Sequence, residues 1–279
     1  NDFNSSMKQC NVSKNRSVSF LPPEDSRVSL TQTGSVVGSD YINASWLSGT
    51  TQSKGFIITQ QPLVSTTSDF WRMVWENEVQ MIVFLGDTTT QDFNIFWPSG
   101  QIFIKTENFI VKSVKDYQES SVASIIYLTI QPSNEGFKRD LCILHHVGFL
   151  CQYCATSALC ELLKLYEETR MRFSEGPVIV VDRFGDTEAA TFCVLVNLTQ
   201  QMKLDSYVDV YSQAKLINLS RPGVWQTLND YVFLYRCLED LIVMRTNSPP
   251  HSAATKPTGF DFTWLQDSRQ SAEHVSGWT

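Results

Sequence analysis

The chain has 279 residues, 42% of them apolar and 18% charged, with a formal net charge of −7. This length and apolar content allow one domain with a full hydrophobic core. The acidic balance argues against nucleic acid or an anionic membrane surface as a main partner. No apolar run approaches the length of a membrane span, and the first residues do not form a signal peptide, so we expect no membrane contact by this chain. Seven cysteines without framework spacing indicate a reducing compartment.

Apolar, β-branched runs alternate with stretches of helical spacing. This order predicts a mixed α/β sheet with helices on its faces. In chain order, the predicted strands cover residues 55–60, 79–85, 101–105, 109–114, 123–130, 140–146 and 178–181. The predicted helices cover residues 67–77, 158–173, 188–201, 207–219 and 226–243. In the first of these helices, Trp71 and Trp75 occupy the face that we expect to pack into the core.

The composition changes after residue 245. We therefore predict a folded domain over residues 1–245 and a Pro/Ser/Thr-rich tail over residues 246–279, which we expect to be disordered. Within the tail, residues 259–267 (GFDFTWLQD) cluster Phe260, Phe262, Trp264 and Leu265. This cluster is either a chance feature or a short segment that docks on this domain or on a partner.

The most informative stretch is PVIVVDRFGDTEAATF, residues 177–192. It predicts a buried strand, a tight loop around Gly185 and a helix, an order that directs free backbone N–H groups and a helix dipole into the loop. Such a loop is shaped to hold an anion. Here it carries Asp182, Asp186 and Glu188 against the single cation Arg183. We expect Asp186 and Glu188, at the start of the helix, to satisfy the N–H groups that a phosphate would use.

The same stretch resembles the phosphate-binding loop of classical protein tyrosine phosphatases, PIVVHCSAGxGRTGTF. The matching residues are Pro177, Val180, Gly185, Thr191 and Phe192. The resemblance places Asp182 at the nucleophilic cysteine and Glu188 at the arginine that grips phosphate. Without a thiolate and a guanidinium fork, neither role can be filled. The vestigial loop comprises Asp182, Arg183, Phe184, Gly185, Asp186, Thr187 and Glu188.

Further motifs extend this resemblance over most of the chain. KNRSVSFLPPEDSRVSL, residues 14–30, is similar to the loop that grips the phosphotyrosine ring, with Ser17 in place of the aromatic residue. RPGVWQTLNDYVFLY, residues 221–235, retains Gln226, which the resemblance identifies as the residue that positions the hydrolytic water. The family frame places the general acid on Cys151, a poor proton donor compared with a carboxyl group. The resemblance implies a tyrosine-phosphatase-like fold, a highly twisted mixed β-sheet flanked by helices on both faces.

Among the branches of the family, the chain resembles the membrane-distal second domain of gamma/zeta-type receptor tyrosine phosphatases and their insect counterparts. This resemblance implies a non-catalytic pseudophosphatase domain with no cofactor and no metal. It would lie on the cytoplasmic side of the plasma membrane, in the intracellular part of a single-pass receptor. Its expected partners are the catalytic first domain of the same receptor, a second receptor copy or cytosolic signalling proteins.

Other interpretations of the same residues stay open at this point. Asp182, Asp186 and Glu188 could serve a magnesium-dependent phosphatase with an aspartate nucleophile. A second alternative is a domain that traps phosphotyrosine peptides without hydrolysing them, although Glu188 and Ser17 oppose it. The residues His145, His146, Cys151, Cys154 and Cys160 could form a zinc site, but adjacent histidines on a strand point to opposite faces. We expect buried thiols and hydrogen-bonded histidines instead, or a reversible disulfide between Cys151 and Cys154.

Overall fold

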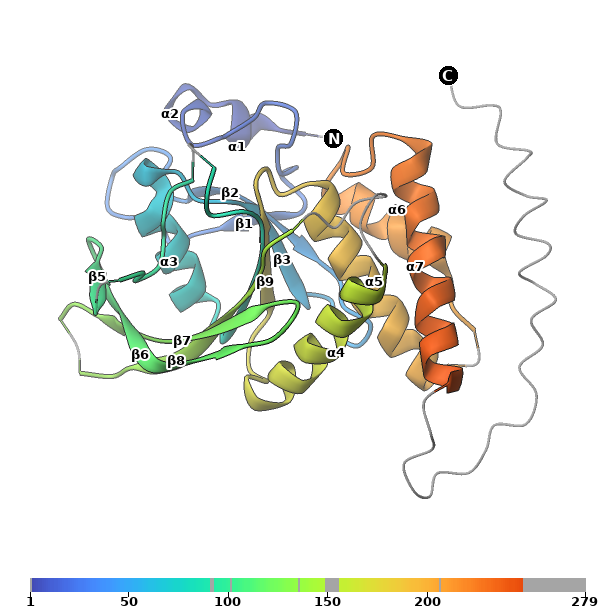
Figure 1. Ribbon diagram of the computed structural model, residues 1–279. Coiled ribbons are helices and arrows are strands. Elements are labelled where there is room, and N and C mark those ends of the chain that lie inside the picture. The colour runs from blue at the N-terminus through green and yellow to red at the C-terminus, as the bar shows by residue number, and fades with distance from the viewer. Residues whose placement is uncertain are drawn as a thin grey trace.

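A computed structural model describes residues 2–90, 93–100, 102–134, 136–148, 156–205 and 207–247. Within these ranges nine strands form one sheet in the order β1-β2-β3-β9-β4-β8-β7-β6-β5 (Figure 1). The strands are β1 (Arg27–Ser29), β2 (Tyr41–Leu47), β3 (Phe56–Gln60), β4 (Met81–Leu85), β5 (Phe103–Lys105), β6 (Phe109–Glu119), β7 (Ser124–Pro132), β8 (Arg139–His146) and β9 (Val178–Asp182). The four central strands β3, β9, β4 and β8 run parallel, and the strands outside them pair antiparallel.

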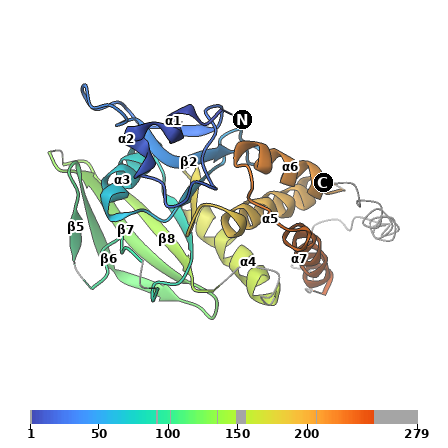
Figure 2. The ribbon, with the colours of Figure 1, turned by 90° about the horizontal axis from the view of Figure 1, so that it is seen from above.

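The helices lie on both faces of this sheet. They are α1 (Asn4–Met7), α2 (Gln9–Val12), the short 3-10 helix η1 (Val64–Thr66), α3 (Thr67–Glu76), α4 (Thr156–Arg172), α5 (Thr187–Leu204), α6 (Val210–Ser220) and α7 (Leu228–Asn247). Figure 2 shows α3 on one side of the sheet and α4 to α7 on the other. The prediction of a mixed α/β sheet with helices on both faces is therefore confirmed.

Alternating side chains of the central strands build two separate cores. In β9, Val178 and Val180 face the core under α4 to α7, whereas Ile179 and Val181 face the core under α3. This alternation follows from the two-residue period of a strand. Because both faces are covered, the central strands contain continuous apolar runs, such as MIVFL in β4 and VIVV in β9. As predicted, Trp71 is fully buried in the α3 core, and Trp75 packs against it.

The sequence did not predict β1 and β2. The β2 sequence YINASWL contains Asn43 and Ser45, which are buried in the sheet although they are polar. These polar residues interrupt the apolar run by which the central strands were predicted. At the other end of the chain, α7 continues to Asn247, two residues past the predicted domain boundary. The tail from residue 248, the predicted general-acid position Cys151 and the neighbouring Cys154 lie outside the described residues.

None of the helices in the described ranges is long and apolar enough to cross a membrane.

Candidate functional site

The vestigial loop lies at the carboxyl end of the central strands, where ligand sites of α/β sheets usually form. Asp182 is the last residue of β9 and stands opposite Gln60 of β3 in the parallel ladder. Its backbone oxygen accepts a hydrogen bond from the Gln61 N–H at 2.7 Å. Helix α5 begins five residues later, at Thr187. The strand, loop and helix therefore have the order predicted from the sequence, with the helix starting one residue earlier.

The side chain of Asp182 fills the loop from within. Its Oδ1 accepts hydrogen bonds from the backbone N–H groups of Phe184 at 3.0 Å, Gly185 at 2.5 Å and Asp186 at 3.0 Å. Its Oδ2 accepts from the N–H of Asp186 at 3.1 Å and of Ala189 at 2.9 Å. Asp182 is only 2% exposed. The N–H groups that would cradle an external anion are thus held by a carboxylate that belongs to the chain.

This arrangement corrects one expectation from the sequence. Asp186 and Glu188 were predicted to satisfy the N–H groups of the cradle. Instead Asp182 accepts hydrogen bonds from four of these N–H groups, those of Phe184, Gly185, Asp186 and Ala189. The Asp186 carboxyl group interacts with the backbone N–H of Thr187. The reason is geometric: the Asp182 side chain starts at the floor of the loop, on β9, and points into the ring of N–H groups. Glu188 lies in the first turn of α5 and is half-buried.

The carboxyl groups of Asp182, which is buried, and Asp186, which is half-buried, lie in one loop, and this shifts the pKa of Asp186. Burial, together with the charge of the neighbouring Asp182 carboxylate and a hydrogen bond to it, raises the pKa of Asp186 to about 8. Two carboxylates this close in a poorly solvated site cannot both ionise without a large cost. The protonated form of Asp186 is therefore favoured in the folded loop.

Arg221 holds the loop through hydrogen bonds to the loop's backbone oxygens. Its Nε donates to the Gly185 oxygen at 2.8 Å, and its Nη2 donates to the Phe184 oxygen at 3.1 Å. The side chain is completely buried, and this burial lowers the pKa of Arg221 to about 10, against the opposing effect of Tyr41, Asp182 and Asp186. The guanidinium is charged at neutral pH and offsets the charge of Asp182. No role for Arg221 was predicted from the sequence. Its place in the RPGVWQ motif, which also contains Gln226, is the sequence feature that could have indicated one.

Gly185 is required by the contact with Arg221. Its φ of +67° lies in the left-handed region that favours glycine. A Cβ at this position would come within 2.7 Å of Arg221 Nη2 and within 2.8 Å of the Gln60 backbone nitrogen. Any other residue would therefore separate the loop from the sheet and from Arg221.

An aromatic pair lies beside the loop. The rings of Phe184 and Phe20 stack with centroids 6.2 Å apart and an interplanar angle of 28°. Phe20 belongs to the segment in which the resemblance places the grip on a phosphotyrosine ring, and the Arg183 guanidinium lies over the Phe184 ring at 5.1 Å. Ser17, in the same segment, turns its hydroxyl oxygen to accept from the Ser19 N–H at 3.1 Å. The two segments are thus joined by an internal aromatic contact.

The remaining predicted site residues are separate from this centre. Gln226 is exposed just before α7, while the same segment reaches the loop through Thr187, whose hydroxyl donates to the Val224 oxygen at 2.6 Å. His145 and His146 bond to the carbonyl oxygens of Gly86 and Val122, as hydrogen-bonded histidines were expected to do. In the part of the chain that the structure describes, no three His, Cys, Asp or Glu side chains gather to hold a metal ion.

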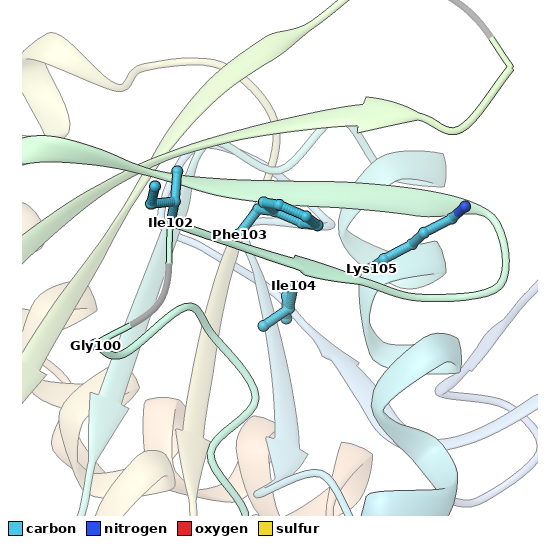
Figure 3. A pocket seen from close by; sticks show the side chains of 5 residues that line it. All are labelled: Gly100, Ile102, Phe103, Ile104 and Lys105. Carbon is cyan, nitrogen blue, oxygen red and sulfur yellow. The ribbon is translucent and has the colours of Figure 1, made fainter.

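A hollow on the surface lies at the edge of the sheet. It is lined by Gly100, Ile102, Phe103, Ile104 and Lys105, along the edge strand β5 (Figure 3). No residue of the vestigial loop contributes to this hollow.

Comparison with known proteins agrees with the resemblance found in the sequence. The family model for protein-tyrosine phosphatase matches residues 11–240. Receptor-type tyrosine-protein phosphatase zeta of Homo sapiens is 36% identical over 259 residues, which cover 90% of this chain and 11% of the relative. Tyrosine-protein phosphatase 99A of Drosophila melanogaster is 35% identical over 237 residues, and the putative receptor-type tyrosine-protein phosphatase mosPTP-1 of Aedes aegypti is 33% identical over 237 residues. These 237 residues cover 85% of this chain and 18% of each insect relative. The chain therefore spans less than a fifth of the length of these relatives.

Proposed function

Because the chain belongs to the protein-tyrosine phosphatase family, we propose that it is a pseudophosphatase domain, which has lost hydrolysis and serves as a regulatory or docking module of a receptor-type phosphatase. One observation carries this proposal: the Asp182 carboxylate occupies the N–H cradle that would hold the substrate phosphate. A phosphate could enter only by displacing it.

The chemistry of the replaced residues supports the loss of hydrolysis. The reaction needs a nucleophile whose attacking atom is available and a cation that stabilises the transferring phosphoryl group. Both oxygens of Asp182 accept backbone hydrogen bonds, which lowers their nucleophilicity. Glu188, at the family's arginine position, adds negative charge where the substrate brings its own. Hydrolysis therefore lacks both components.

The two other functions considered from the sequence gain no support from these contacts. A magnesium-dependent aspartate nucleophile would need Asp182 oxygens free to bind metal and phosphorus, yet backbone N–H groups hold them. A phosphotyrosine trap would need room for an aromatic ring beside the cradle. Phe184 and Phe20 stack there instead.

The proposed partners follow from the receptor-type relatives. We propose that the domain binds the catalytic first domain of the same receptor, a second receptor copy or a cytosolic signalling protein. It would do so on the cytoplasmic side of the plasma membrane, as the intracellular part of a single-pass receptor. A well-packed fold with a closed loop suits a binding role, since its surface is available while its former active site is inert.

Activity assays test the proposal directly. The purified chain should hydrolyse neither p-nitrophenyl phosphate nor a phosphotyrosine peptide, with or without Mg²⁺. Turnover above a buffer blank that Asp182→Ala abolishes would overturn it.

A stepwise repair series tests the assignment of roles. We expect a near-blank rate for Asp182→Cys, detectable aryl phosphatase activity when Glu188→Arg is added, and a further gain when Cys151→Asp supplies the acid. Such non-additivity is normal for groups that act as a unit. Robust turnover from Asp182→Cys alone would show that Glu188 does not oppose the substrate.

A further inference from the structure

Strand β5 leaves an unpaired edge on the sheet. It is the last strand in the sheet order and pairs only with β6 among the described strands. Two apolar residues at this edge are open: Phe103 of β5 is 50% exposed, and Ile102, which precedes the strand, is 79% exposed. The hollow in Figure 3 runs along these residues. Exposed apolar edges of this kind are templates for pairing with a further strand.

The hydrogen bonds of β5 show which backbone groups are available. The Ile102 oxygen accepts from the Ser113 N–H at 3.0 Å, and the Thr106 N–H donates to the Phe109 oxygen at 2.8 Å. In an antiparallel pair, alternate residues direct their N–H and C=O groups to the partner. Residues 102, 104 and 106 therefore bond toward β6. Phe103 and Lys105 direct their backbone groups to the open edge.

This edge is basic in an acidic molecule. Lys105 on β5 and Lys112 on β6 are exposed, and Lys112 stands opposite Phe103 in the ladder. Both lysines lie on the same face as the Phe103 ring, because directly opposed residues share a face. The chain as a whole carries a net charge of −7. A partner strand for this edge should accordingly combine apolar and acidic residues.

One segment of the chain has that composition. Residues 260–265, FDFTWL, alternate aromatic Phe260, Phe262 and Trp264 with Asp261 and Thr263. A two-residue alternation of this kind is the pattern of a strand with one apolar face. Asp261 and Asp267 are the only charged residues between positions 257 and 268. The segment therefore offers aromatic side chains to Phe103 and carboxylates to Lys105 and Lys112.

We propose that residues 260–265 of a second copy of this chain add to β5 as a further strand of the sheet. The donor is assigned to a second copy because the end of α7, from which the tail continues, and β5 lie at opposite ends of the molecule in both views (Figures 1 and 2). If each copy donates its residues 260–265 to the other, the two copies form a closed dimer with twofold symmetry. The open backbone groups of β5 are then hydrogen-bonded in both sheets. This inference does not depend on whether the domain is catalytic.

The test is the mass of the chain in solution, by light scattering after size exclusion. The full chain should form a dimer with about twice the mass of one copy, which is 31.7 kDa, whereas a version that ends at Asn247 should be monomeric. A dye-labelled peptide of residues 258–267 should bind the shortened version, with a rise in fluorescence anisotropy.

Matched variants identify the surface. Phe103→Pro removes an outward N–H while leaving the bonds to β6, so it should abolish peptide binding. Lys105→Glu should weaken binding at least tenfold, whereas Lys164→Glu on α4 makes the same charge change away from the edge and should have no effect. In the full chain, Phe262→Asp should give monomers and Ser271→Asp should not. A monomeric full chain, a dimer that persists without the tail, or peptide binding unchanged by Phe103→Pro would each overturn the proposal.

Discussion

The vestigial loop and the segment of residues 14–27 meet at the contact between Phe184 and Phe20, yet their backbones are held in different ways. Residues 14–27 keep the polar contacts that fix their backbone: the Arg16 Nε donates to the Gln61 oxygen at 2.6 Å, and the Tyr41 hydroxyl donates to Asn15 at 2.6 Å. The side chain at Ser17 departs from the family pattern, which has an aromatic residue at this position. In the loop, by contrast, the Asp182 carboxylate holds the backbone from within. The difference shows that one region is fixed by contacts with its neighbours and the other by a side chain of its own.

The largest expected effect comes from removing that side chain. Asp182→Ala should lower the free energy of unfolding by roughly 3–5 kcal/mol, because it leaves the buried N–H groups of four residues without an acceptor. Urea denaturation measures this loss. Asp182→Asn, which keeps one oxygen acceptor but not the charge, should lose less.

Asp209→Ala is the matched control for this substitution. Asp209 is the N-cap of α6, and its carboxylate accepts from the Ser212 N–H at 2.8 Å. Loss of an N-cap costs about 1 kcal/mol. Equal losses for Asp182→Ala and Asp209→Ala would show that the Asp182 carboxylate is no more than an ordinary cap.

The pH dependence of stability probes the second carboxyl group of the loop. The pKa of Asp186 is raised from 3.8 to about 8 in the folded chain, so the folded state binds more protons than the unfolded state between these values. Its contribution to stability is complete below the unfolded pKa and is lost as the pH rises through about 8. Asp186→Asn should therefore flatten the fall of the melting temperature between about pH 4 and pH 8.

Asp87→Asn is a control in which the carboxyl pKa is shifted in the opposite direction, downward instead of upward. Hydrogen bonds from Thr89 lower the pKa of exposed Asp87, so its stabilising effect is lost as the pH falls. This variant should change the profile only on the acidic side. If Asp186→Asn leaves the slope between about pH 4 and pH 8 unchanged, the two loop carboxyl groups do not share a site.

A smaller effect is expected where the two regions meet. Replacing both Phe20 and Phe184 by Leu should cost less than the sum of the single replacements, with a coupling of about 0.5–1.5 kcal/mol for the stacked rings. A double-mutant cycle by urea denaturation measures the coupling. The same cycle with exposed Val18 and Phe184 should give none. Zero coupling between Phe20 and Phe184 would mean that the loop and the segment are held independently.

The smallest effect is expected at Glu188. Glu188→Ala should lower stability by about 0.3–1 kcal/mol, since a negative charge in the first turn of α5 complements the helix dipole. Thermal unfolding at low ionic strength would detect it. A gain in stability would instead show that repulsion from the loop carboxylate dominates.

Much of the fold was predictable because its central strands are covered on both faces. The apolar run of β4 (Met81–Leu85) and the first four residues of β9, VIVV, follow directly from that burial. Strand β2 was not predictable, since Asn43 and Ser45 are buried through hydrogen bonding and sheet pairing rather than through apolar character. The acidic loop was also evident from the sequence. Which carboxylate fills it was not, because that depends on the direction of the Asp182 side chain at the end of β9. The contact between Phe20 and Phe184 joins residues far apart in the chain, and no local pattern reports it.

The Asp182 side chain has one further consequence, which concerns competition. A group joined covalently to the site that it fills acts at an effective concentration, which for flexible tethers is about millimolar and for well-oriented groups on the order of 10⁵ M or more. The Asp182 carboxylate starts from a buried strand and already holds its five N–H contacts, so it belongs near the upper end of this range. Under the proposed function, we expect dissolved phosphate or a phosphopeptide at millimolar concentration not to displace it. The conformation of the loop should then be insensitive to the phosphorylation state of its surroundings.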